Sequence, residues 1–243
     1  MIGLVLAAGA GRRLAPLTDD LPKTLLPVQG ERPLLDLTIH NMASVGLTDV
    51  AIITGFAEHR IRDVVPDLQE RHGVTIELVH NDHALDRNNA YSLWCARALI
   101  RQGVLLCNGD TMHPASVEED LLAARGPALL LAVDRAKHLG HEEMKIALDS
   151  AGTVARISKE LPVAQADGEY IGLTLIEPLI AEPLVEALET VWRRDPQLYY
   201  EDGYQALVNR GHPVDVHPID TADWVEIDDH ADLARARELA CRY

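Results

Sequence analysis

The N-terminal stretch of the chain combines glycines and cations in an order suited to binding phosphate. An apolar run over residues 2–8 predicts a buried strand, which leads directly into Gly9 and Gly11. Glycine permits a tight turn and lets backbone amides approach a ligand closely. Two arginines at 12–13 and then Lys23 supply positive charge. A strand that opens into a glycine turn followed by cations predicts a phosphate-binding loop.

Better-known phosphate motifs fit this stretch less well. A P-loop ends in Gly-Lys-Ser/Thr, which is absent from the loop. A dinucleotide fingerprint needs a third glycine where Leu14 stands and a helix directly after it, whereas Pro16 and Pro22 predict an extended loop. An ordinary strand and turn with surface arginines is the remaining alternative, since two glycines alone would not exclude it. The spacing favours a phosphate loop with a remote lysine, Lys23.

A carboxylate follows the apolar strand that we predict at residues 104–107. Asp110 lies in Leu-Leu-Cys-Asn-Gly-Asp-Thr, so its side chain should project from the end of that strand. Carboxylate oxygens are the ligands that Mg²⁺ prefers in proteins. Aspartate is also common in turns for structural reasons alone. Beside a phosphate loop, the interpretation of Asp110 as a metal ligand is favoured.

The composition of the 243 residues excludes several classes of function. A net charge of −16 argues against nucleic acid or an anionic membrane as partner. A phosphate-binding protein this acidic must screen its own charge, which a divalent cation held by carboxylates would do. No apolar run approaches the roughly 20 residues of a membrane-spanning helix, and the run at 2–8 is too short for a signal peptide. Three scattered cysteines indicate free thiols, so we expect a cytoplasmic protein.

Strands and helices alternate through the first part of the chain. Predicted strands lie at 2–8, 49–54, 74–79, 104–107 and 128–134, and predicted helices at 33–45, 61–71, 89–102 and 116–124. This alternation predicts an α/β fold, a Rossmann-like three-layer sandwich around a mostly parallel central sheet. Ligands bind such sheets beyond the carboxyl ends of the strands, where Gly9, Gly55 and Asp110 fall.

The second part of the chain has a different rhythm. Predicted strands at 145–148, 154–157 and 170–176 follow one another in hairpin-like connections, and a further strand is predicted at 214–218. Predicted helices lie at 178–194, 201–210 and 231–242. We interpret the chain as a single domain, 1–243, with a small inserted region in its second part.

Two segments resemble the signature of a known enzyme family. Leu-Ala-Ala-Gly-x-Gly-x-Arg-Leu at 6–14, followed by Leu-Pro-Lys-x-Leu-x-Pro-Val at 21–28, is similar to the pattern of the nucleotidyltransferases that activate sugar phosphates and related small phosphorylated acceptors. Arg12 departs from this pattern, because the family usually has Ser or Thr in that place. The resemblance implies that residues 1–135 form a nucleotide-binding part and residues 136–243 an acceptor-binding and closing part.

The resemblance also implies roles for single residues. Lys23 would contact the α-phosphate region, and Asp110 would coordinate Mg²⁺. Asp228, in Trp-Val-Glu-Ile-Asp-Asp-His, matches the second metal carboxylate of the family, with Glu226 on the same strand face as second choice. Asp229 is a natural helix N-cap, so one of this acidic pair could be purely structural.

Further stretches resemble one branch of the family. Asn-Asn-x-x-Ser-Leu-Trp at 88–94, together with Glu-Met-Lys at 143–145 and Ile-Ser-Lys at 157–159, looks like the CTP-using enzymes for phosphocholine and for small phosphonates such as 2-aminoethylphosphonate. Tyr-Tyr-Glu-Asp at 199–202 resembles the branch's aromatic and acidic segment, which in the phosphocholine enzymes holds a quaternary ammonium by cation–π attraction. The two tyrosines could equally pack at the start of a helix.

The resemblance implies two groups of ligand-binding residues. The nucleotide-binding group is Leu6, Ala7, Ala8, Gly9, Ala10, Gly11, Arg12, Arg13, Lys23, Asn88, Asn89, Ser92 and Gly109. The acceptor-binding group is Lys145, Lys159, Glu169, Tyr200 and Glu201. Lys159 matches a family lysine that binds the acceptor's phosphoryl group. For Lys145 or Lys159 alone, a surface salt bridge is an equal alternative.

These features together predict a Mg²⁺-dependent cytidylyltransferase. It would transfer CMP from CTP to a small phosphonate or phosphomonoester acceptor and release pyrophosphate, with Lys23, Arg13 and the loop amides neutralising charge. A sugar-1-phosphate uridylyl- or thymidylyltransferase is the alternative within the class. A catalytically silent nucleotide-binding regulatory protein is the alternative outside it, against which the intact Lys23, Asp110 and Asp228 argue. A Rossmann dehydrogenase is disfavoured by the missing third glycine. The sequence does not decide between a phosphonate and phosphocholine as the acceptor, and it does not predict the oligomeric state.

Overall fold

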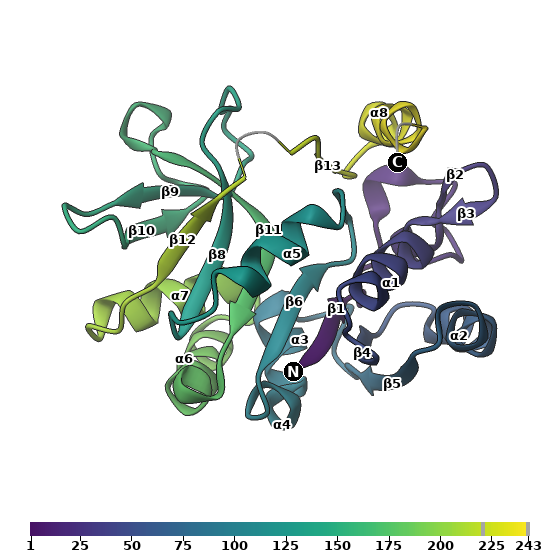
Figure 1. The fold of residues 1–243 in the computed structure, drawn as a ribbon, viewed down its shortest axis with the longest axis horizontal. Helices are drawn as coiled ribbons and strands as arrows, with labels where there is room; N and C mark the ends of the chain where they lie inside the picture. Colours follow the sequence, from purple (N-terminus) through teal and green to yellow (C-terminus); the bar gives the residue numbers. More distant parts are fainter. Residues whose placement is uncertain (220–221, 242–243) are drawn as a thin grey trace.

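The computed structural model describes residues 1–219 and 222–241 of the chain. At the centre of the sheet, β1 (Ile2–Leu6) pairs in parallel with β4 (Asp49–Thr54) on one side and with β6 (Val104–Asn108) on the other (Figure 1). β5 (Thr75–His80) extends the sheet beyond β4. Because helices cover such a sheet on both faces, its strands are apolar runs. The sequence pattern therefore located these strands closely.

The other half of the sheet is mixed. β11 (Gly168–Ile176) runs antiparallel to β6, to β8 (Leu129–Asp134) and to β9 (Lys145–Leu148). β10 (Val154–Ser158) pairs antiparallel with β9, and β12 (Asp215–Pro218) pairs in parallel with β8. No α-helix separates β9, β10 and β11, a connection that suits antiparallel neighbours. Among the described strands of this sheet, only β10 and β11 run against the rest, which confirms a mostly parallel sheet.

Helices pack on both faces of the sheet and complete the predicted three layers. One face is covered by α1 (Leu34–Ser44), α2 (Glu58–His72) and α5 (Ser116–Ala123). Their apolar residues form one core with side chains of the strands, such as Leu105 of β6. This core contains Leu35, Ile39 and Met42 of the helix predicted at 33–45, and Val117 and Leu121 of the helix predicted at 116–124.

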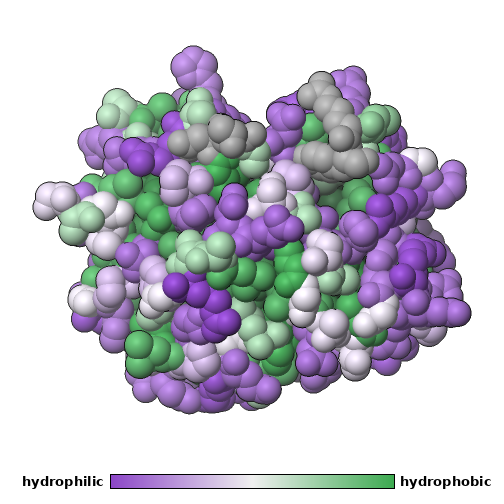
Figure 2. All heavy atoms as spheres, in the orientation of Figure 1, coloured by the Kyte–Doolittle hydropathy of each residue, from purple (hydrophilic) through white to green (hydrophobic). Residues whose placement is uncertain are grey.

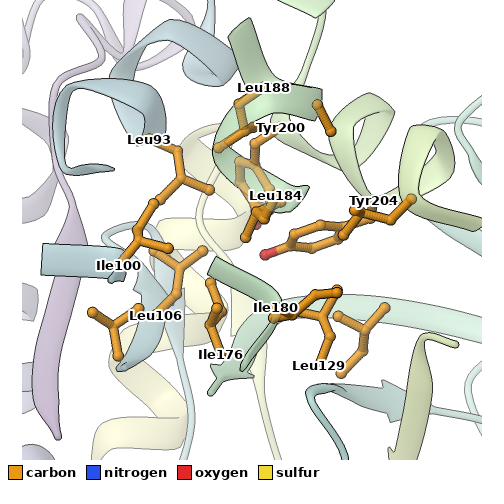
Figure 3. Packing of buried hydrophobic residues seen from close by; sticks show 14 of the residues in the cluster. Leu93, Ile100, Leu106, Leu129, Ile176, Ile180, Leu184, Leu188, Tyr200 and Tyr204 are labelled. Carbon is orange, nitrogen blue, oxygen red and sulfur yellow. The ribbon is translucent and has the colours of Figure 1, made fainter. Parts of the chain in front are cut away.

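The opposite face is covered by α3 (Asn89–Cys95), α6 (Ala181–Arg194) and α7 (Tyr200–Asn209). Leu106 of β6 packs in this second core, with residues of α6 and α7 around it (Figure 3). Successive side chains of a strand point to opposite faces, so Leu105 and Leu106 belong to different cores.

Two predicted helices are interrupted. The helix predicted at 89–102 is divided at Ala96 into α3 and α4 (Arg97–Ile100). The helix predicted at 178–194 begins as a 3₁₀ turn over Pro178–Ile180 and continues as α6. Another 3₁₀ turn, Val163–Gln165, lies between β10 and β11. The apolar face continues across such a break, so periodicity alone does not detect it.

Short strands and the last helix bring an N-terminal segment and the C-terminal segment of the chain together. β2 (Pro27–Gln29) pairs with β3 (Arg32–Pro33), and β7 (Thr111–Met112) pairs with β13 (Val225–Glu226). α8 (His230–Ala240) follows β13 and lies beside β2 (Figure 1). A third apolar cluster joins α8 to the N-terminal loop and to α1.

The C-terminal helix is shorter than predicted. The sequence predicts a helix over 231–242, whereas α8 ends at Ala240. Arg242 lies outside the described residues. The helix begins at His230 because Asp229 caps it, its side chain accepting from the backbone N–H groups of Ala231 and Asp232.

The described part of the chain contains no helix long and apolar enough to span a membrane. The three cysteines, Cys95, Cys107 and Cys241, are free. Figure 2 shows hydrophilic residues along much of the outline of the face in view, with hydrophobic side chains between them.

Candidate active site

The predicted phosphate loop leaves the carboxyl end of β1 and turns at its glycines. Gly11 adopts a left-handed conformation with φ +58°, and its carbonyl accepts from Thr18 Oγ1 at 2.9 Å. A Cβ on Gly9 would meet no atom within 4 Å, so Gly9 lies open to the neighbouring cleft. Arg12–Leu14 then forms a single 3₁₀ turn, not the long helix of a dinucleotide fold.

Lys23 lies between two aspartates that are far away in the sequence. Its ammonium is 2.8 Å from Asp110 Oδ2 and 3.0 Å from Asp228 Oδ1. The 3₁₀ turn Lys23–Leu25 presents this side chain, which is 16% exposed. Burial alone would lower the pKa of Lys23, but the two carboxylates raise it above its ordinary value. Lys23 is therefore a fixed positive charge at this point.

A two-residue ladder brings the two aspartates together. β7 and β13 pair antiparallel, and Ile227 N–H donates to the Asp110 carbonyl at 2.8 Å. Asp228 follows directly, and its backbone N–H donates to Asp232 Oδ2 in the first turn of α8. The two neighbouring aspartates therefore have different roles. Asp228 forms an ion pair with Lys23, and Asp229 caps α8.

Three carboxylates at this point could hold one cation. Asp110, Glu226 and Asp228 each offer an oxygen, and these atoms lie within 4.8 Å of one another among the described residues. Asp110 Oδ1 is buried and has no hydrogen-bond partner in the described chain. Burial, and then the neighbouring Asp110 and Asp228, raise the pKa of Glu226 to about 8. An all-oxygen set of donors suits a hard divalent cation.

Charge at Asp228 is balanced by a second cation. Arg13 Nη2 lies 2.6 Å from Asp228 Oδ2. Burial would raise the pKa of Asp228, but Lys23 and Arg13 hold it below its ordinary value. Asp228 is therefore ionised at neutral pH.

These groups border a cleft of about 280 Å³ at the carboxyl ends of β1 and β6, where the sequence predicts the ligand. The predicted nucleotide-binding residues that line it are Leu6, Ala8, Gly9, Arg13, Asn88, Asn89 and Ser92. Gly109 allows the turn after β6 to pack against β1, because a Cβ there would sit 2.6 Å from the Leu6 carbonyl oxygen. Ala7, Ala10 and Arg12 belong to the same glycine loop.

The polar side chains at the start of α3 also bind the protein itself. Asn88 caps α3, and its Nδ2 donates to the Gln197 carbonyl at 2.9 Å. Asn89 Oδ1 accepts from the backbone N–H of Tyr200 at 2.9 Å. Ser92 Oγ accepts from Asn81 Nδ2 at 2.8 Å. The start of α3 is thus joined to the segment that leads into α7.

Two of the predicted acceptor-binding residues, Lys159 and Glu201, also line the cleft. Lys159 Nζ lies 5.2 Å from the centre of the Tyr199 ring. The side chain of Glu201 is buried, and its Oε2 has no hydrogen-bond partner among the described residues. Burial raises the pKa of Glu201 to about 7, although Lys159 opposes this. The pair offers one positive and one negative group to a ligand.

The other three predicted acceptor-binding residues lie outside the cleft lining. Lys145 is buried and donates to the carbonyls of His141 and Glu143 at 2.9 and 3.0 Å. Glu169 pairs with Lys137 at 2.8 Å. Tyr200 is fully buried. The structure brings none of these three side chains into the cleft.

Sequence reasoning missed residues that the fold places in the cleft, among them Arg87 and Asn108. Asn108 directly precedes Gly109 and Asp110, the two residues of this turn that the sequence predicts to bind ligand. The guanidinium carbon of Arg87 lies 4.3 Å from the centre of the Tyr91 ring, and no sequence motif predicts this contact.

Comparison with known proteins places the chain among enzymes that transfer nucleotidyl groups. The family described as Nucleotidyl transferase matches residues 2–131. The chain is 30% identical to the CMP-5'-(3-aminopropyl)phosphonate synthase of Streptomyces rubellomurinus, over 96% of this chain but only 38% of that protein's length. It is 26% identical to the 2-aminoethylphosphonate cytidylyltransferase of Lancefieldella rimae, over 95% of this chain and 89% of that protein.

Solved structures share the fold. The inositol-1-phosphate CTP transferase of T. maritima superimposes with a TM-score of 0.84 at 22% identity, covering 99% of this chain and 95% of the other. The CTP:phosphocholine cytidylyltransferase of Streptococcus pneumoniae superimposes with a TM-score of 0.74 at 22% identity, covering 98% of each chain. At this identity the likeness establishes the α/β architecture.

Replacing Lys23 tests the charge balance of the site. Lys23→Met leaves Asp110 and Asp228 without the ammonium between them, so the free energy of unfolding at pH 7 should fall by about 1–3 kcal/mol. Urea denaturation without divalent cations measures this change. Arg13→Met is the matched control, because the Arg13 side chain is 61% exposed and exposed ion pairs contribute little. Equal stability of Lys23→Met and the wild type would show that the Lys23 ammonium does not stabilise the two aspartates.

Proposed function

The chain belongs to the nucleotidyl transferase family, and on that premise we propose that it is a Mg²⁺-dependent cytidylyltransferase acting on a small phosphonate that carries an amine. The observation that carries the proposal is the placement of Lys23 between Asp110 and Asp228 beside the open glycine loop. This arrangement offers cations, amides and carboxylates on one side of a cleft, as a metal-bound triphosphate requires.

Asp110, Glu226 and Asp228 are the residues proposed to hold Mg²⁺. They supply oxygen donors within 4.8 Å of one another, and the unpartnered Asp110 Oδ1 leaves a lone pair available. When bound, Mg²⁺ would neutralise charge on the triphosphate. Lys23 and Arg13 already face these carboxylates and would neutralise charge on the α-phosphate and on the leaving pyrophosphate.

The reaction needs no general base in this site. An oxygen of the acceptor's phosphonate is already anionic, so it can attack the α-phosphorus in line. A bond forms between that oxygen and the α-phosphorus, and the bond to the bridging oxygen of the β-phosphate breaks, so pyrophosphate leaves with the electron pair. The protein contributes positioning and charge stabilisation.

The choice of CTP and of an aminated phosphonate rests on two supports. Two relatives that align along nearly the whole chain are named for 3-aminopropylphosphonate and 2-aminoethylphosphonate. In the lining of the same cleft, Lys159 suits a phosphonate oxygen and the unpartnered Glu201 suits an ammonium group. Tyr199 adds an aromatic face near both.

Pyrophosphate release with Mg²⁺ tests the proposed substrates. CTP, UTP, dTTP, ATP and GTP are each combined with phosphocholine, 2-aminoethylphosphonate, 2-hydroxyethylphosphonate, phosphonoformate and glucose-1-phosphate. We expect release with CTP and 2-aminoethylphosphonate to exceed every other combination. Turnover with UTP or dTTP and glucose-1-phosphate would instead make the protein a sugar-phosphate enzyme, and silence in all combinations would contradict the proposal.

Neutralising Glu201 tests its assigned partner. Glu201→Gln keeps the shape of the side chain and removes its charge, so the KM for 2-aminoethylphosphonate should rise about tenfold or more. The KM for 2-hydroxyethylphosphonate, which has no ammonium, should change little. Glu160→Gln, at an exposed position beside Lys159, is the matched control.

The pH dependence provides a second readout for Glu201. Its pKa is raised to about 7, so the carboxylate is mainly protonated at pH 6 and mainly ionised at pH 8. Discrimination in favour of the aminated acceptor should therefore grow as pH rises through 7, and Glu201→Gln should abolish this growth. Equal responses of the two acceptors to the substitution would show that Glu201 does not meet the amine.

A further inference from the structure

Tyr200, the first residue of α7, is fully buried yet bonded to a residue of the cleft lining. Its hydroxyl donates to Asn108 Oδ1 at 2.9 Å and lies 3.1 Å from the Tyr170 hydroxyl. Figure 3 shows its ring beside that of Tyr204 in the core. Burial raises the pKa of Tyr200 well above its ordinary value, so the phenol keeps its proton and remains a donor.

In this hydrogen bond the Tyr200 hydroxyl is the donor and Asn108 Oδ1 the acceptor, which sets the orientation of the Asn108 amide. A carboxamide has an acceptor oxygen and an NH₂ donor. With Oδ1 bound to the Tyr200 phenol, Nδ2 is left as the free end, and no described residue accepts a hydrogen bond from it. Asn108 lines the cleft two residues before Asp110. The amide therefore presents a donor to a cleft whose ligands carry acceptor oxygens.

Strand β11 makes room for this amide. A Cβ on Gly172 would sit 2.5 Å from Asn108 Nδ2, so any larger residue would displace it. Gly172 has φ +85°, in the left-handed region that favours glycine, and the pairing of β11 with β8 shifts register between Tyr170 and Thr174. Irregularities of this kind re-aim side chains next to sites.

The backbone of Tyr200 orients a second amide of the cleft. Its N–H donates to Asn89 Oδ1 at 2.9 Å, and since a backbone N–H can only donate, the Asn89 oxygen must face α7. The same helix start carries Glu201 into the lining of the cleft. One turn of α7 thus contacts Asn108 and Asn89 and carries Glu201, and all three line the cleft.

We propose that Tyr200 is a positioning residue that holds the Asn108 amide with its NH₂ group toward the cleft, where it donates a hydrogen bond to an oxygen of a bound substrate. Naming the substrates, CTP or an aminated phosphonate, rests on the proposed function. Both carry acceptor oxygens, and separate binding measurements identify which one Asn108 meets. Tyr200 thus acts through Asn108, without touching the acceptor itself.

A double-mutant cycle between Tyr200→Phe and Asn108→Ala tests this role. Calorimetry measures the binding of Mg-CTP and of 2-aminoethylphosphonate separately, without turnover. Asn108→Ala should weaken one of the two ligands about tenfold, and Tyr200→Phe should weaken the same ligand about threefold. The double variant should bind no more weakly than Asn108→Ala alone, because residues that act in series are not additive.

Two further variants separate positioning from folding. Tyr204→Phe is the matched control, because Tyr204 lies in the same buried aromatic cluster and its hydroxyl has no hydrogen-bond partner among the described residues. It should leave both affinities unchanged. Asn108→Asp retains an oxygen for the Tyr200 phenol, but it replaces the NH₂ donor with a second acceptor oxygen and adds a negative charge, so it should lose at least as much affinity as Asn108→Ala.

Unchanged affinity for both ligands in Asn108→Ala and Asn108→Asp would overturn the proposal. Additive effects of Tyr200→Phe and Asn108→Ala would also overturn it, because the tyrosine would then act elsewhere. A protein that binds ligand in the expected Asn108-dependent way but releases no pyrophosphate would contradict the proposed function and leave the positioning role standing.

Discussion

The arrangement of the cleft depends on holding like charges together. Asp110, Glu226 and Asp228 bring carboxylate oxygens within 4.8 Å of one another in a chain of net charge −16. Coulomb repulsion at that distance opposes folding unless it is offset. The Lys23 ammonium lies between two of the three groups, and a pKa of about 8 keeps Glu226 largely protonated at neutral pH. A divalent cation would offset the same repulsion more strongly. The three neighbouring carboxylates, which repel one another without a cation, are therefore suited to bind the proposed Mg²⁺.

Distant parts of the chain meet to build this arrangement. Lys23 comes from the N-terminal loop, Asp110 from the end of β6 and Asp228 from the segment before α8. The hydrogen bonds between β7 and β13 set the spacing of the backbones, and the apolar cluster under α8 holds the two ends of the chain in place. A similar long-range connection joins α3 to the start of α7 through Asn88 and Asn89. Contacts between elements far apart in the sequence thus position the residues that line the cleft.

Much of this could be predicted from local sequence, and the rest required the fold. The apolar strands and the glycine loop followed from residue patterns with a direct physical cause. The expectation that Asp110 and Asp228 lie in one site followed from the family resemblance. The burial of Lys145 and Tyr200 did not, because a short motif does not state which face of a strand or helix its residues occupy. The break at Ala96 between α3 and α4 could not be predicted, because the apolar face of the predicted helix continues across it. Asn108 was missed because its role depends on Tyr200, 92 residues away.

The electron paramagnetic resonance signal of free Mn²⁺ measures directly whether Asp110, Glu226 and Asp228 hold a divalent cation. We expect the wild type to bind Mn²⁺ in the presence of CTP and Asp110→Asn to bind it about tenfold or more weakly. Asp63→Asn, on the exposed surface of α2, should bind as the wild type does. Equal binding of Mn²⁺ by Asp110→Asn and the wild type would contradict a metal site at these carboxylates.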